Sequence, residues 1–93
     1  MSDFARWTKW FACGRELGPG KTNALALMVW IAARAASDGT GLEFHAQSWP
    51  SVADDVGLTV DEARMALDML IAHGLVTAVG QQTSERLLAR AVI

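Results

Sequence analysis

The chain has 93 residues, of which 52% are hydrophobic and 19% are charged, and its formal net charge is −2. This length accommodates one compact domain, 1–93, and leaves no room for a separate catalytic domain. No apolar run approaches the roughly 20 residues that a membrane-spanning helix needs, and the N-terminal residues lack the apolar core of a signal peptide. Cys13 is the only cysteine, which excludes an internal disulfide, and we expect it to be a small buried residue. These features predict a cytoplasmic protein without membrane contact.

The charges are distributed unevenly along the chain. Residues 1–37 hold five basic and two acidic side chains, whereas residues 38–73 hold seven acidic side chains and Arg64 alone as a base. Residues 74–93 return to a small positive excess. The acidic middle segment is expected to matter more for the choice of partner than the total charge does.

Aromatic and apolar spacing predicts two helices in the first part of the chain. Phe4, Trp7 and Phe11, with Trp10 more loosely, recur at spacings of three and four, which predicts an N-terminal helix within residues 1–17. We expect this aromatic face to pack on the rest of the domain, although aromatic residues interleaved with basic ones could also contact a second copy of the chain or a nucleic-acid backbone. A glycine–proline–glycine turn follows. The same periodicity predicts a core helix over residues 22–37, with Thr22 or Asn23 as its N-cap and a glycine beyond its C-terminal end.

Residues 48–73 carry the capping and turn residues of a helix-turn-helix. Ser48 can cap a first short helix that has a proline in its first turn, where the missing N–H is harmless. Gly57 can adopt the positive φ that a tight turn between helices requires. Thr59 can cap the second helix, and Glu62 lies three residues later, where it completes a capping box.

Short strands are predicted on both sides of this unit. Residues 42–44 alternate apolar, acidic and apolar side chains, which is typical of a brief strand. Residues 75–93 read as two strands joined by a polar loop, that is, a hairpin. The expected fold class is therefore mainly α with a small β-hairpin.

The turn between the two short helices carries a recognisable series of residues. The series begins with Val52, Ala53, Asp54, Asp55, Val56, Gly57, Leu58 and Thr59, and continues with Ala63, Ala66, Leu67 and Leu70 and then Gly74, Leu75 and Val76. In this order, with the preceding core helix and the terminal hairpin, the series resembles the winged helix-turn-helix superfamily, in particular bacterial, phage and plasmid DNA-binding domains. The resemblance covers about two thirds of the chain and implies a winged helix-turn-helix with an extra N-terminal helix.

The resemblance implies that the protein binds duplex DNA as a transcriptional or replication regulator of a phage or plasmid. In such domains the second helix of the pair enters the major groove of DNA, and the hairpin lies along the DNA backbone or the minor groove. A homodimer would match a symmetric operator. The DNA contacts implied by position, together with the basic residues near the N-terminus, are Thr59, Arg64, Gln81, Gln82, Thr83, Ser84, Arg86, Arg6, Lys9, Arg15 and Lys21.

The charge of the second helix leaves a different function open. DNA-binding members usually place cations and amides on its outward face, because phosphates need cations and base edges need donors. This chain has carboxylates there instead, with Val60, Met65, Met69 and Ile71 expected to lie outside the buried stripe. The alternative is a protein-binding winged helix, such as an anti-CRISPR-like inhibitor or accessory protein whose acidic face engages a nucleic-acid-binding partner. Its interface residues would be Val60, Asp61, Glu62, Met65, Asp68 and Met69.

Patterns that would indicate catalysis are weak. The glycine-rich segment 14–22 has five residues between Gly14 and Gly20, where a phosphate-binding loop has four, and it follows a helix and not a strand. His45 and His73 lie far apart without a metal-ligand pattern around them. We therefore expect no enzyme, with no catalytic, cofactor-binding or metal-binding residue.

Overall fold

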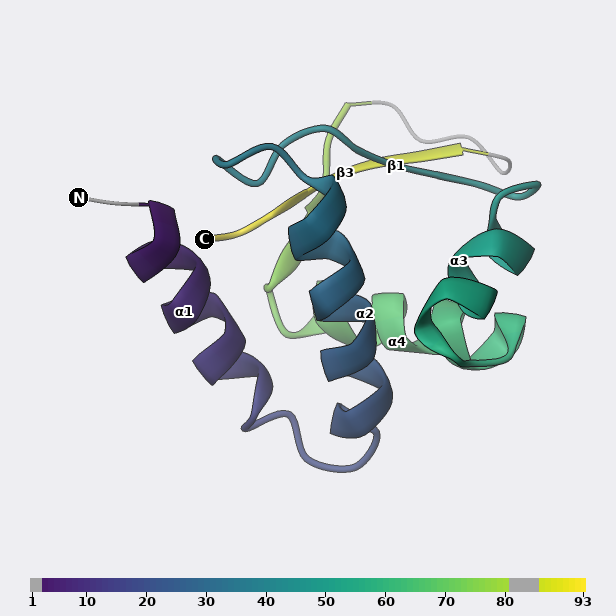
Figure 1. Ribbon diagram of the computed structural model, residues 1–93, viewed down its shortest axis with the longest axis horizontal. Coiled ribbons are helices and arrows are strands. Elements are labelled where there is room, and N and C mark those ends of the chain that lie inside the picture. Colours follow the sequence, from purple (N-terminus) through teal and green to yellow (C-terminus); the bar gives the residue numbers. More distant parts are fainter. Residues whose placement is uncertain (1–2, 81–85) are drawn as a thin grey trace.

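The computed structural model describes residues 3–80 and 86–93 (Figure 1). Helices dominate it, and a small antiparallel sheet lies against them. Mainly α architecture is thus confirmed. The elements in chain order are α1 (Asp3–Gly14), α2 (Lys21–Arg34), β1 (Leu42–His45), α3 (Trp49–Val56), α4 (Val60–Ala72), β2 (Val76–Ala78) and β3 (Arg86–Ala91).

The sheet has three strands where the sequence predicted a hairpin and a separate short strand. β3 lies in the middle, pairing with β2 on one side and with β1 on the other. The register places Leu42 opposite Ala89 and Val76 opposite Ala91, so that small buried residues of β3 face larger apolar residues of its neighbours. From α2 onward the chain forms a helix, a strand, two helices and two strands. This order is compatible with a winged helix.

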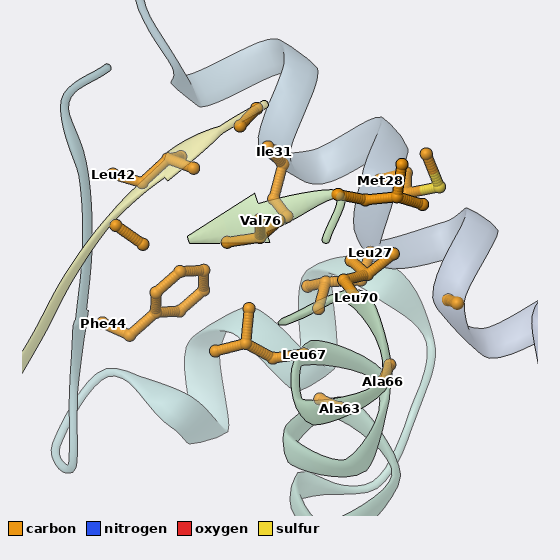
Figure 2. Packing of buried hydrophobic residues seen from close by; sticks show 14 of the residues in the cluster. Leu27, Met28, Ile31, Leu42, Phe44, Ala63, Ala66, Leu67, Leu70 and Val76 are labelled. Atoms are coloured by element: carbon orange, nitrogen blue, oxygen red, sulfur yellow. The ribbon is translucent and has the colours of Figure 1, made fainter. Parts of the chain in front are cut away.

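The core is built around α2, which lies across the middle of the molecule (Figure 1). Leu27, Met28 and Ile31 are fully buried at spacings of one, three and four residues, so that one face of the helix is covered. Figure 2 shows these side chains together with Leu70 of α4 and Val76 of β2. Burial of these side chains contributes apolar stabilisation to the fold.

The N-terminal helix is attached through its second half. Trp10 is 2% exposed, and its indole Nε1 donates a hydrogen bond to the carbonyl oxygen of Leu75 at 2.8 Å. Phe4, which the sequence placed on the packing face, is 79% exposed. That prediction is wrong because α1 diverges from α2 toward its first turn, so only the later turns reach the core (Figure 1). Trp7 occupies the edge, where its Nε1 donates to the carbonyl oxygen of Ser37 at 3.1 Å.

The ends of α2 also differ from the prediction. The helix begins at Lys21 with Gly20 at the N-cap in a left-handed conformation, and neither Thr22 nor Asn23 caps it. The tight glycine–proline–glycine turn bends back on itself through a hydrogen bond from the Lys21 N–H to the Gly18 carbonyl, which starts the helix early. The helix ends at Arg34, before the predicted residue 37.

An aromatic stack ties β1 to the helices on either side. The Phe44 ring lies 5.1 Å from the Trp49 ring of α3 at an interplanar angle of 17°, and 5.6 Å from the Trp30 ring of α2. Phe44 is almost completely buried. Stacked and tilted pairs of this kind add to the energy of simple burial, so this stack fixes α3 relative to α2 and the sheet.

We predict that Phe44→Ala lowers the free energy of unfolding by about 3–5 kcal/mol, because a large buried ring is replaced by a cavity at the centre of the stack. The exposed Phe4 provides the matched control, and Phe4→Ala should change the free energy of unfolding by less than about 0.5 kcal/mol. Urea titrations followed by tryptophan fluorescence measure both values. Equal losses for the two variants would contradict this account of the core.

Candidate macromolecular interface

The turn between α3 and α4 has the conformation that the sequence predicts. Gly57 has φ 74°, in the left-handed region, and its N–H returns to the carbonyls of Ala53 and Asp54. The Leu58 N–H also donates to the Ala53 carbonyl, at 2.9 Å. Ala53 is buried, so its small side chain suits the close approach of the two helices. The proline at position 50 lies in the first turn of α3 as expected, but the Ser48 hydroxyl bonds the backbone of His45 and caps nothing.

The predicted capping box at the start of α4 is confirmed. The Glu62 N–H donates to the Thr59 hydroxyl oxygen at 3.1 Å, and the Thr59 N–H donates to the Glu62 carboxylate at 2.9 Å. The hydrogen bonds from the Thr59 backbone and side chain hold the pKa of Glu62 below its ordinary value. An ionised carboxylate of the chain itself therefore occupies the helix N-terminus, a position that can otherwise receive a phosphate.

The exposed side of α4 is acidic and carries one large apolar side chain. Its buried face consists of Ala63, Ala66, Leu67 and Leu70. The opposite side, which we call the outward ridge, consists of Asp61, Met65, Asp68 and Ala72, at the spacing of one helical face.

Met65 stands out on the outward ridge because it is 69% exposed. Val60, Met69 and Ile71, which the sequence placed in the same exposed apolar set, are half-buried and pack against the core. The expectation of a broad exposed apolar surface is therefore wrong, and Met65 is the large hydrophobic side chain of α4 that is exposed.

Arg64 lies on the flank of α4 that faces α3, and not on the outward ridge. Its guanidinium is 5.9 Å from the centre of the Trp49 ring, within the range of a cation–π contact. At the other end of the aromatic stack, the Arg34 guanidinium lies 5.2 Å from the Trp30 ring and pairs with Asp55 at 3.2 Å. Two arginines thus enclose the stack. Sequence reasoning missed Arg34, although its spacing of four residues from Trp30 on one helix was an available signal.

Arg86 begins β3 opposite His45 of β1, on the exposed face of the sheet and not on the buried face that carries Phe44. Its Nε lies 2.9 Å from the Glu43 carboxylate, which also contacts the His45 ring. Desolvation raises the pKa of Glu43, but the hydrogen bond and charge of Arg86, with His45, outweigh it and lower the pKa overall. Arg86 therefore has an acidic partner within the sheet.

The basic residues near the N-terminus lie away from α3. Arg6 and Lys9 are on α1, where Arg6 donates to the Ile93 carbonyl at 3.4 Å, and Figure 1 places α1 and α3 at opposite ends of the molecule. Arg15 follows α1 and Lys21 begins α2, and both are exposed. The structure does not bring Arg6 and Lys9 onto one surface with Arg64. The remaining predicted contacts, Gln81, Gln82, Thr83 and Ser84, lie outside the described residues.

A groove runs between α4 and the turn that joins α1 to α2. Its volume is about 360 Å³. Met69 forms part of the floor beneath the turn, and a Cβ on Gly20 would lie 2.9 Å from the Met69 Cε methyl. The groove is lined by Pro19, Gly20, Asn23, Glu62, Met65, Ala66 and Met69.

Cys13 is exposed, so the expectation that it is buried is wrong. Cys13 directly precedes Gly14 of α1, which is buried against α2: a Cβ at position 14 would lie 2.4 Å from the Met28 sulfur. The side chain at position 13 therefore points away from α2. Among the described residues, histidine, cysteine, aspartate and glutamate form no group of three or more that could hold a metal ion. No helix in the described part of the chain is long and apolar enough to cross a membrane.

Comparison with known proteins returned no match, whether the chain was compared with protein-family models, with curated proteins or with solved structures. The geometry of α4 and its surroundings is therefore the basis on which a function is proposed.

We predict that Thr59→Ala lowers the free energy of unfolding by about 1 kcal/mol, because the start of α4 loses its side-chain cap. Circular dichroism during urea unfolding measures this loss. An unchanged value would show that the capping box contributes nothing to the stability of the domain.

The lowered pKa of Glu62 also predicts a pH dependence. The contribution of its carboxylate to stability is complete above the ordinary glutamate pKa and is lost as the pH falls through the lowered pKa of the folded state. Glu62→Gln keeps a cap of the same shape without a titrating group. The stability advantage of the wild type over this variant should therefore shrink as the pH falls below about 5, and a difference that is constant with pH would contradict the assignment.

Proposed function

We propose that this chain is a non-enzymatic winged-helix module that binds a basic surface of a partner protein through the outward ridge of α4. The observation that carries the proposal is the composition of the ridge, in which Asp61 and Asp68 flank the exposed Met65. An exposed methionine among carboxylates combines an adaptable apolar contact with charges that select a cationic partner.

Electrostatics favours a basic protein over a nucleic acid at this surface. The carboxylates of the ridge and the ionised Glu62 at the start of α4 repel the phosphate backbone that a DNA-reading helix must approach. The same charges accelerate encounter with lysine- and arginine-rich surfaces. The partner class that follows is a nucleic-acid-binding protein whose basic site is occupied by this domain, as expected for an inhibitor or accessory protein of a phage or plasmid.

Duplex DNA is the second candidate, and a specific arrangement favours it. Arg64 and Arg34 lie at the two ends of the aromatic stack, and Arg86 lies on the exposed face of the sheet, where it pairs with Glu43. A duplex that approached the stack would meet Arg64 and Arg34, and one that also contacted the exposed face of the sheet would meet Arg86. These contacts would be made beside the outward ridge and not by it.

We predict that Asp61→Lys with Asp68→Lys abolishes partner capture, because the reversed ridge repels a basic surface. Glu16→Lys with Asp54→Lys is the matched control, since it changes the net charge equally at exposed positions off the ridge. The measurement is affinity capture from nuclease-treated host lysate, followed by identification of the captured proteins. We expect the wild type and the control variant to capture a protein with a basic surface, and the ridge variant to lose it. Equal capture by both variants would refute the ridge as the interface.

The same proteins should be tested against labelled duplexes of random and native-locus sequence over a series of salt concentrations. We expect no sequence-specific binding at physiological salt. The second candidate would be favoured by tight binding that Arg64→Ala and Arg86→Ala each weaken. The logarithm of its binding constant should then fall with the logarithm of the salt concentration, at a slope of about −0.9 per neutralised phosphate.

A further inference from the structure

We propose that the groove between α4 and the α1–α2 turn receives one apolar anchor side chain from a basic, amphipathic helix of the partner. This inference rests on the proposed function and specifies what the partner must present: an apolar side chain on a lysine- or arginine-rich helical face.

The groove and the outward ridge share a wall. Met65 belongs to both, while Met69 and Ala66 form the inner side of the groove on α4. A partner helix that paired its cations with Asp61 and Asp68 would therefore carry neighbouring side chains past the groove. Anchors in recessed apolar pockets dominate the binding energy of most protein interfaces.

The size and lining of the groove fit an aliphatic or methionine side chain. Its volume of about 360 Å³ is at the lower end of the range for ligand pockets. Two methionines line it, and their flexible, polarisable thioethers adapt to different apolar shapes. On the other side the chain turns at Gly20, whose φ of 87° and missing side chain let the Met69 Cε methyl pack against the turn.

The charge at the rim selects a basic helix and not a neutral one. Glu62 lines the groove, and the hydrogen bonds from Thr59 keep its pKa below the ordinary value. Asp61 and Asp68 lie beside it on the ridge. Lys21 is exposed and follows Gly20 in the chain, so one cation lies on the turn side, whereas Glu62 lines the groove and Asp61 and Asp68 lie on the adjoining ridge.

The probe for this inference is a synthetic helical peptide with a lysine-rich face and one leucine at its centre. Two companion peptides replace the leucine by serine or the lysines by glutamate. Binding is followed by NMR of protein labelled with ¹³C at the methionine methyl groups. The Met65 and Met69 methyl signals should shift with the first peptide, whereas that of the buried Met28 should not.

The matched variants are Met65→Ala and Val29→Ala, both at exposed apolar positions, of which Val29 lies on α2 away from the groove. We expect Met65→Ala and the leucine-to-serine peptide each to weaken binding by about tenfold, as for removal of an interface anchor. Val29→Ala should leave it unchanged, and the glutamate peptide should not bind.

Three results would overturn the inference, and they separate it from the proposed function. The lysine peptides with leucine and with serine could bind equally well and leave the Met65 and Met69 signals unchanged. The groove is then refuted as the anchor site, while the acidic ridge stands as the interface. If the glutamate peptide binds as well as the lysine peptide, the selection of a basic helix is refuted. If no peptide binds and the duplexes do, the proposed function fails and the groove with it.

Discussion

The stacking of Phe44 on Trp49 is the interaction on which the arrangement of this domain depends. Phe44 comes from the short strand β1, and Trp49 begins α3 only a few residues later. Through Trp30 the same stack reaches the central helix α2, and through the Arg64 guanidinium it reaches α4. One row of rings therefore sets the position of both helices of the pair against the sheet, and α4 takes its place on the surface as a result.

Local signals in the sequence predicted the local structure well. The left-handed turn at Gly57 and the capping box of Thr59 and Glu62 each depend on residues within a few positions, so their chemistry could be read directly. The early start of α2 was missed because the preceding turn, and not a side chain, supplies its N-cap.

Features that depend on distant contacts could not be read in the same way. The pairing of β1 with β3 joins residues more than forty positions apart, and a strand of four residues carries no record of its partner. Phe4 and Trp10 both fit a helical stripe, but only the position of the Leu75 carbonyl decides which of them is buried. The interface is a similar case. Helical spacing predicted the acidic residues on the exposed face of α4, but only the structure shows that Met65 is exposed, that Met69 is half-buried and that Arg64 lies on the flank.

The function follows from which side chains α4 presents, because the fold is compatible with more than one kind of partner. The most direct measurement is a charge-swap cycle between Asp68 and a basic residue of the captured partner. Asp68→Lys and a lysine-to-aspartate variant of the partner should each weaken the complex, and combining them should restore most of the affinity, because the pair of opposite charges is re-formed. Losses that simply add in the combined complex, for every basic residue of the partner's binding surface, would contradict the assignment of the outward ridge as the interface.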